Sequence, residues 1–221
     1  MLAFFCLLII FLCIFLNYQK KVNVYNNEKS KILSKISLSD WNLKLVNQDH
    51  EISSDLVKLG IVQENLYVDE RIVESTKDLL AAAVEAGYPL RIISAYRSID
   101  DQRSLVEEGI ERELSKGLSY EEAKAEVYRF TNRPGCSEHH TGLALDIKEE
   151  VDRENGKSTW LKENAVNFGF ILRYPKGKEG ITKIGYEPWH YRFVGVDVAK
   201  YLEKNQLVLE ELVEQLEKGT A

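Results

Sequence analysis

Three of the four histidines in this sequence fall in two short stretches that also carry carboxylates. His139 precedes Asp146 by seven residues, and His190 follows Glu187 by three. Zinc accepts histidine nitrogens and carboxylate oxygens, and catalytic zinc sites usually combine three protein ligands with a water molecule. His139, Asp146 and His190 would complete such a set and leave Glu187 as a base beside the metal. Spacing alone leaves open the alternative that these are ordinary surface or structural histidines.

The segment around Asp146 predicts how such a site would be assembled. Residues 143–147 alternate between more and less apolar side chains, as a half-buried strand does, and Asp146 lies on the less apolar face. An unpaired carboxylate is costly there, so Asp146 needs a cation or several hydrogen-bond donors. The odd offset would put His139 on the opposite face of a straight strand. We therefore expect the chain to turn at Gly142, so that the imidazole and the carboxylate converge.

The remaining pattern mixes helices and strands. Pro188 separates Glu187 from His190, which predicts a turn followed by a strand rather than a helical His-Glu-x-x-His arrangement. Periodicity and capping signals predict helices at 69–87, 98–114, from 119, at 160–168 and at 209–216, and strands at 90–96, 143–147, 170–174 and 190–194. Regular β-α-β units are absent from this pattern. The sequence therefore predicts an α+β fold, a single domain with a central antiparallel sheet flanked by helices.

The N-terminal end of the chain has a different character. Its first 16 residues carry no charged or strongly polar side chain, and as a helix they would span about 24 Å of a hydrocarbon core of about 30 Å. No small-x-small cleavage site follows, so we expect residues 1–19 to be an uncleaved signal-anchor, 20–40 a polar tether and 41–221 the soluble domain. A cleaved signal peptide and a buried helix of the domain are the alternatives. Lysines follow the run and none precedes it, which by the positive-inside rule favours a cytoplasmic domain.

Composition excludes several classes of protein. The 221 residues are 44% hydrophobic and 29% charged, which is typical of a globular chain and not of a disordered or disulfide-stapled one. Acidic residues outnumber basic ones by 35 to 29, giving a net charge of −6. Nucleic-acid binders usually carry a basic surplus, so no nucleic acid is expected as a partner.

Four motifs follow one another along the chain. They are Ser-Ala-Tyr-Arg-Ser at 94–98, Ser-x-His-x-x-Gly-x-Ala-x-Asp at 137–146, Gly-Phe-Ile-Leu-Arg-Tyr-Pro at 169–175 and Glu-Pro-Trp-His-Tyr at 187–191. Their order and spacing, over roughly residues 41–215, resemble the VanY-type zinc D-alanyl-D-alanine carboxypeptidases. The resemblance implies the Hedgehog/D,D-peptidase fold, an extracytoplasmic site of action and a peptidoglycan stem peptide ending in D-alanine as substrate.

The resemblance also implies a role for individual residues. Its zinc ligands, one ion per chain, would be His139, Asp146 and His190, its catalytic base Glu187, and its transition-state-stabilising group Arg97. Ser137 either hydrogen-bonds the substrate backbone or simply holds the turn. Gln102 is a weaker candidate for substrate contact, with an exposed polar role as the alternative. Arg173 and Tyr174 either line the cleft or form an ordinary strand-end pair.

Taken together, these features predict a membrane-anchored zinc metallopeptidase that removes the terminal D-alanine from peptidoglycan stem peptides. The implied site of action places the domain outside the cell membrane as a single-pass protein, against the charge rule. One alternative is an L,D-carboxypeptidase that acts on tetrapeptide stems. Another is a non-catalytic domain that binds the cell wall, which the presence of Glu187 and Arg97 beside all three ligands disfavours.

Overall fold

The computed structural model describes residues 2–53, 57–150 and 160–219. Met1, where the predicted anchor begins, and residues 220–221, where the predicted domain ends, lie outside the described residues. Contacts divide the chain into two compact units, Met1–Ser37 and Leu38–Ala221. The first is the helix α1, and the second holds every other helix and strand named below.

Helix α1 runs from Leu2 to Leu33. The predicted polar tether at 20–40 is therefore helical as far as Leu33, because the segment contains no glycine or proline and an established helix propagates readily through lysine and glutamate. Its side chains are described from Ile10 onward, and the apolar ones are exposed at Ile10, Phe11, Leu12, Ile14, Phe15 and Leu16. Within the described part of the chain, we find no helix with both the length and the hydropathy that a membrane crossing needs.

A four-stranded antiparallel sheet forms the centre of the second unit, as predicted. Its order is β3 (Leu90–Ser94), β4 (Ala144–Glu149), β6 (His190–Phe193) and β5 (Phe170–Leu172). Each neighbouring pair is antiparallel. Strands β4 and β6 therefore lie in the middle, and they carry two of the predicted ligands, Asp146 and His190.

A separate hairpin precedes the sheet and was not predicted. It joins β1 (Leu59–Gln63) to β2 (Leu66–Asp69) through a tight turn in which Asn65 has a φ of 60°. Asparagine tolerates this left-handed conformation better than most residues. The available signal was thus a turn residue between two short runs of β-branched and aromatic side chains.

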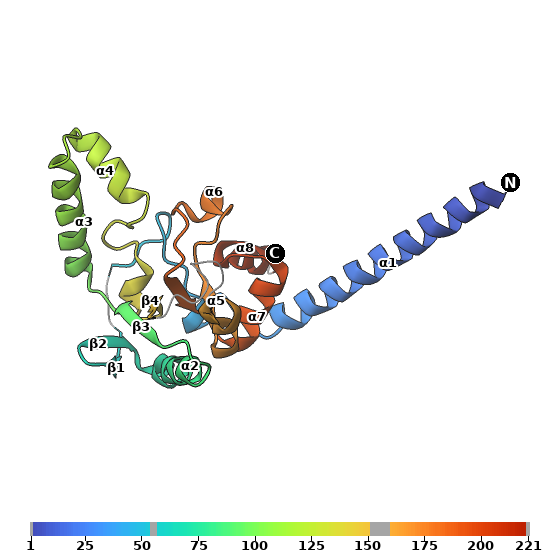
Figure 1. Ribbon diagram of the computed structural model, residues 1–221, viewed down its shortest axis with the longest axis horizontal. Coiled ribbons are helices and arrows are strands. Elements are labelled where there is room, and N and C mark those ends of the chain that lie inside the picture. Colours follow the sequence, from blue (N-terminus) through green and yellow to red (C-terminus); the bar gives the residue numbers. More distant parts are fainter. Residues whose placement is uncertain (1, 54–56, 151–159, 220–221) are drawn as a thin grey trace. The chain divides into compact units, whose positions relative to one another are not determined.

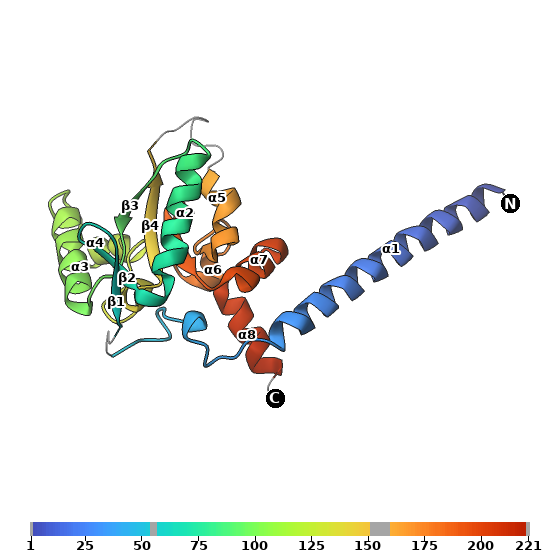
Figure 2. The ribbon, with the colours of Figure 1, turned by 90° about the horizontal axis from the view of Figure 1, so that it is seen from below.

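The main core lies between the sheet and the helix α2 (Val73–Glu85), which Figure 2 shows running alongside β3 and β4. The side chains of Leu79 and Ala83 on this helix are buried. The helix α5 (Trp160–Asn164) also contributes to this core. The sheet supplies most of the remaining apolar side chains, among them Ile92, Leu145, Ile147, Phe170, Tyr191 and Phe193.

Helices α3 (Ile99–Leu114) and α4 (Tyr120–Tyr128) lie side by side and enclose a small apolar cluster of their own (Figure 1). Both begin with the predicted capping box, in which Ser98 or Ser119 exchanges hydrogen bonds with an acidic residue three positions later. The N-terminal end of α3 is thereby fixed at Ile99, two residues after Arg97 of the predicted site.

The chain ends with α7 (Val196–Asn205), which was not predicted, and the predicted α8 (Leu209–Gly219). The former packs against β5 and the short helix that precedes it. The remaining helical segments are short: Trp41–Leu43, Glu70–Ile72, Glu138–Thr141, Ala165–Phe168 and α6 (Glu179–Thr182).

Gly142 allows a direct test of the turn that leads into β4. Its φ is +67°, and a Cβ at this position would lie 2.5 Å from the backbone nitrogen of Asp69. We expect Gly142→Ala to lower the free energy of unfolding by more than about 2 kcal/mol, because it combines backbone strain with a backbone clash. Urea denaturation followed by circular dichroism measures this loss.

Gly177→Ala is the matched control. Gly177 also has a positive φ, +83°, but a Cβ there meets nothing within 4 Å. This variant should lose only the strain of a left-handed alanine, about 1 kcal/mol. Equal losses in the two variants would mean that the contact with Asp69 does not constrain the turn.

Candidate active site

Strand register sets three polar residues in one row across the sheet. Ser94 on β3 pairs with Asp146 on β4, and Asp146 pairs with His190 on β6. Directly opposed residues of antiparallel strands point to the same face and lie within contact distance. The sheet therefore gathers a hydroxyl, a carboxylate and an imidazole from three chain segments that are distant in sequence.

The second histidine reaches this row through a short helical turn. Residues Glu138–Thr141 form a 3-10 helix that Gly142 ends in the left-handed conformation. Ser137 begins it, and its Oγ accepts a hydrogen bond from the backbone nitrogen of His139 at 3.4 Å. The His139 Nε2 atom comes to 3.4 Å from Asp146 Oδ2. The predicted turn at Gly142 and the convergence of imidazole and carboxylate are both observed.

His139, Asp146 and His190 form a group that can hold one metal ion. A potential ligand atom from each lies within 4.8 Å of the others. His190 Nδ1 is 3.2 Å from Asp146 Oδ1, and the two imidazole planes meet at 84°. Asp146 Oδ1 is buried and has no hydrogen-bond partner among the described residues. A buried carboxylate that faces two imidazoles and has one oxygen without a donor is what a zinc site of this type requires.

The local charges favour a cation at this position. Burial alone would raise the pKa of Asp146, but the charges of His139 and His190 hold it below its usual range. Burial alone would lower the pKa of His190, yet its contacts with Asp146 and Glu138 raise that pKa to about 9. Carboxylates that stabilise a protonated imidazole would equally stabilise a divalent ion.

Glu187 lies beside this group with a buried side chain. Pro188 interrupts the chain between Glu187 and His190, and β6 begins at His190, so the predicted turn followed by a strand is confirmed. Glu187 Oε2 lies 3.6 Å from His190 Nδ1. Burial, with a further contribution from the charge of Asp146, raises the pKa of Glu187 to about 7. A carboxyl group with such a pKa can both accept and release a proton near neutral pH.

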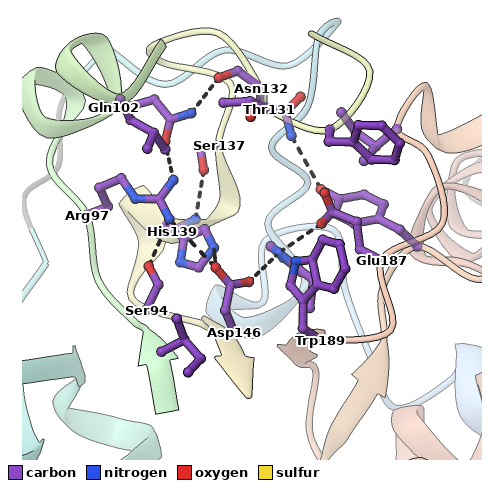
Figure 3. Close-up of a pocket in the computed structure, with 16 residues that line it drawn as sticks. Ser94, Arg97, Gln102, Thr131, Asn132, Ser137, His139, Asp146, Glu187 and Trp189 are labelled. Atoms are coloured by element: carbon purple, nitrogen blue, oxygen red, sulfur yellow. Dashed lines mark hydrogen bonds and ion pairs between the residues drawn. The ribbon is translucent and has the colours of Figure 1, made fainter. Parts of the chain in front are cut away.

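Arg97 approaches the row from the loop after β3 (Figure 3). Its Nη1 donates to Gln102 Oε1 at 2.7 Å, and its Nη2 donates to Ser94 Oγ at 2.8 Å. The same Nη2 is 3.8 Å from Asp146 Oδ2. These contacts hold the guanidinium beside the metal-binding group.

Gln102 is buried in the structure, and not exposed as one of the two alternatives predicted. Its side chain is 1% exposed, and its Nε2 donates to the backbone oxygen of Asn132 at 2.5 Å. An exposed polar role is therefore wrong for this residue. Gln102 borders the pocket, but both ends of its amide are engaged within the protein, so it positions Arg97.

These groups line a pocket of about 520 Å³. Ser137 is among the lining residues, so it both begins the turn and faces the cavity, which keeps its two predicted roles compatible. The polar centre is surrounded by apolar side chains: Ile93, Leu105, Phe130, Ile184 and Trp189. A small polar floor within an apolar wall is typical of sites that bind and orient a small substrate.

Sequence reasoning missed a set of charges behind the pocket. Tyr174 lines the cavity, whereas its neighbour Arg173 is fully buried and does not. Arg173 and Arg192 both donate to Glu138, which is also fully buried. The only available signal was an arginine within or directly after a short apolar strand, where solvent exposure is the commoner explanation.

The sequence of this chain is similar to those of known carboxypeptidases. Residues 65–196 match the sequence model of the VanY family, described as D-alanyl-D-alanine carboxypeptidase. The chain is 38% identical over 176 residues to a D-alanyl-D-alanine carboxypeptidase of Enterococcus faecalis, an alignment that covers 78% of this chain and 65% of the relative. The chain thus spans just under two thirds of that relative's length.

Two solved structures extend the comparison. A mutant of the vancomycin-resistance D,D-pentapeptidase VanY from the VanB-type cassette, in complex with Zn(II), superimposes with a TM-score of 0.74 and 36% identity, covering 79% of this chain and 99% of the other. The LD-carboxypeptidase LdcB gives a TM-score of 0.60 and 32% identity, covering 79% and 87%. Both similarities extend over most of the second unit.

The metal-binding group can be tested without any substrate. We expect His190→Ala to reduce the affinity for Zn(II) by more than about 100-fold, because it removes a ligand rather than a group that merely supports one. Competition with a chromophoric chelator measures the affinity. His50→Ala is the control, since His50 contacts Asn47 and does not line the pocket. Unchanged affinity in the His190 variant would rule out this ligand set.

Proposed function

This chain belongs to the VanY family of D-alanyl-D-alanine carboxypeptidases, and on that premise we propose that it removes the terminal D-alanine from peptidoglycan stem peptides with one zinc ion. The observation that carries the proposal is the buried group of His139, Asp146 and His190, with Glu187 and Arg97 beside it in one pocket. A metal-binding group, a base and a fixed cation are the parts that amide hydrolysis needs.

His139, Asp146 and His190 would hold the zinc ion. When bound, zinc polarises the scissile carbonyl and lowers the pKa of the attacking water. Glu187 accepts a proton from the attacking water as the water oxygen bonds to the carbonyl carbon. The C–N bond then breaks, and Glu187 delivers the proton to the amine nitrogen of the departing D-alanine. Burial places the pKa of Glu187 near 7, which suits a group that first accepts and then donates.

Arg97 stabilises the negative charge that develops on the carbonyl oxygen. Its guanidinium is already held by Gln102 and Ser94, so little reorganisation is needed when that charge appears. Preorganised donors of this kind act more strongly on the transition state than on the substrate. Ser137, which lines the same pocket, would hydrogen-bond the substrate backbone.

The second candidate activity is that of an L,D-carboxypeptidase, because the chain is also similar to the LD-carboxypeptidase LdcB. Both activities would use the same metal-binding group and differ in the walls of the cleft. We expect the zinc-loaded chain to release D-alanine from a defined pentapeptide stem ending in D-alanyl-D-alanine. Mass spectrometry of parallel digests with pentapeptide and tetrapeptide stems measures the preference. Cleavage of the tetrapeptide alone would assign the L,D activity instead.

The roles of Glu187 and Arg97 predict a separation between metal binding and turnover. Glu187→Gln keeps the shape but removes the base, so kcat should fall by about 100-fold or more while zinc remains near one ion per chain. Arg97→Ala should also keep its metal and lose about 100-fold or more, mainly in kcat. Zinc analysis of the purified variants, combined with steady-state kinetics, makes the distinction.

Arg103→Ala provides the control for Arg97, because Arg103 is an exposed residue on α3 that pairs only with nearby Asp100 among the contacts described. It should retain full turnover. Loss of zinc from Glu187→Gln would make Glu187 a ligand, and full activity in that variant would place the base elsewhere.

We also propose that the segment 1–19 holds the chain at a membrane, with the domain on the outer side. Support comes from the uninterrupted apolar run and from the exposed side chains of its described part, such as Phe11 and Ile14. Contiguous apolar surface of this kind is unfavourable in water. Action on peptidoglycan would require the extracytoplasmic side.

The anchoring proposal predicts that the full chain sediments with membranes and that its domain is cleaved by protease added outside the cell. Replacing Leu12 and Phe15 by lysine should release a fraction of the chain, because charges in the hydrocarbon core are costly. Recovery of a soluble form that begins after residue 16 would instead identify a cleaved signal peptide.

A further inference from the structure

Glu138, which directly precedes the proposed ligand His139 in sequence, lies in an unusual environment for a carboxylate. It is fully buried and does not line the pocket, although Ser137 and His139 on either side of it do. Its Oε1 atom accepts hydrogen bonds from Arg173 Nε at 2.8 Å and from Arg192 Nη1 at 2.9 Å. Both arginines are fully buried as well. One oxygen of Glu138 is thus fixed by two cations.

The other oxygen faces His190. Glu138 Oε2 lies 3.7 Å from His190 Nε2, and among the described residues neither atom has a hydrogen-bond partner. The opposite ring nitrogen, Nδ1, faces Asp146 and Glu187 on the metal-binding side. Two buried, unpartnered atoms of complementary type therefore point at each other behind the proposed zinc site.

The other histidine is held differently. His139 Nδ1 donates to the backbone oxygen of Ala95 at 2.6 Å, which leaves Nε2 toward Asp146. The two histidines therefore turn opposite nitrogens to the metal-binding group, Nε2 in His139 and Nδ1 in His190. The partner of the outer nitrogen is a neutral carbonyl for His139 and a carboxylate for His190.

We propose that Glu138 is a positioning residue for His190: its Oε2 accepts the Nε2 proton and so fixes Nδ1 as the nitrogen that binds the metal. The inference rests on the proposed zinc function for the identity of the ion. A carboxylate behind a ligating imidazole sets its tautomer, orients its ring and makes it a stronger donor to the metal.

The two arginines explain why a carboxylate can be kept at this position. Glu138 supplies one negative charge, and Arg173 is shared with Glu210 of α8 through bonds of 2.9 and 2.6 Å. The charges of the two arginines and two glutamates therefore balance, so none of these buried charges is left without a partner of opposite sign. Arg192 is held further by the backbone oxygens of Asn42 and Lys44. The Glu138 carboxylate is consequently fixed from several chain segments at once.

The first measurement uses the zinc-loaded protein without substitution. In a long-range nitrogen–proton NMR spectrum of the chain labelled with ¹⁵N-histidine, His190 should carry its proton on Nε2, and the signal should lie downfield and exchange slowly. His139 should carry its proton on Nδ1. A proton on Nδ1 of His190, or an Nε2 proton in rapid exchange with water, would overturn the proposal even if every Glu138 variant failed to fold.

The second measurement compares two variants with the same change of charge. Glu138→Gln should weaken Zn(II) binding by about 10- to 100-fold and shift the His190 Nε2 proton upfield. Glu210→Gln removes the other carboxylate from Arg173 but leaves the Glu138–His190 pair, so it should keep the zinc affinity and the proton signal. Equal effects of the two variants on zinc affinity would reduce Glu138 to a structural role.

These outcomes are independent of the proposed reaction. Zinc affinity and the His190 signal are measured without substrate, so they can support the role of Glu138 even if the chain cleaves no stem peptide. Conversely, a chain that cleaves D-alanyl-D-alanine while its His190 binds through Nε2 would keep the proposed function and reject this inference.

Discussion

The Asp146 carboxylate is the charge around which the second unit of this protein is organised. It lies on the middle of the sheet with little exposure to water, and it meets His139, His190 and Arg97 from three different segments. A carboxylate in such a position is tolerated only if cations or donors surround it. The register of three strands, the turn at Gly142 and the loop after β3 each bring one of these groups to it.

Behind this pocket lies a second buried carboxylate with its own cations. Glu138 is adjacent to His139 in sequence, yet it points away from the cavity into a set of arginines on β6 and after β5. The domain thus has two adjacent charged clusters. The cluster around Asp146 lines the pocket, and the cluster around Glu138 does not. His190 lies between the two clusters, with the carboxylate of Glu138 on one side and that of Asp146 on the other. Its ring is constrained from both sides, which is how a ligand keeps a fixed direction.

The sequence predicts those parts of the site that depend on local rules. The need for a turn at Gly142 and the two serine capping boxes follow from neighbouring residues, and the structure agrees with both. The alternation around Asp146 is less complete than predicted, because Ala144 on the less apolar face is buried as well. The charged cluster around Glu138 depends instead on contacts between residues 35 and 54 positions apart. In sequence Arg173 and Arg192 resemble solvent-exposed strand residues, and only tertiary packing reveals that they are buried. The extent of α1 was missed for a simpler reason, since a polar composition does not stop a helix that lacks glycine and proline.

The pairing of Asp146 with His190 across β4 and β6 has a consequence for folding fidelity. A slip of one residue between these strands would turn every side chain of the displaced strand to the other face, and the two ligands would separate. Zinc would then bind tightly only to chains whose central strands are correctly aligned. A ligand that binds only one conformation stabilises that conformation by mass action. The ion would therefore favour the correct strand register as well as serve as a cofactor.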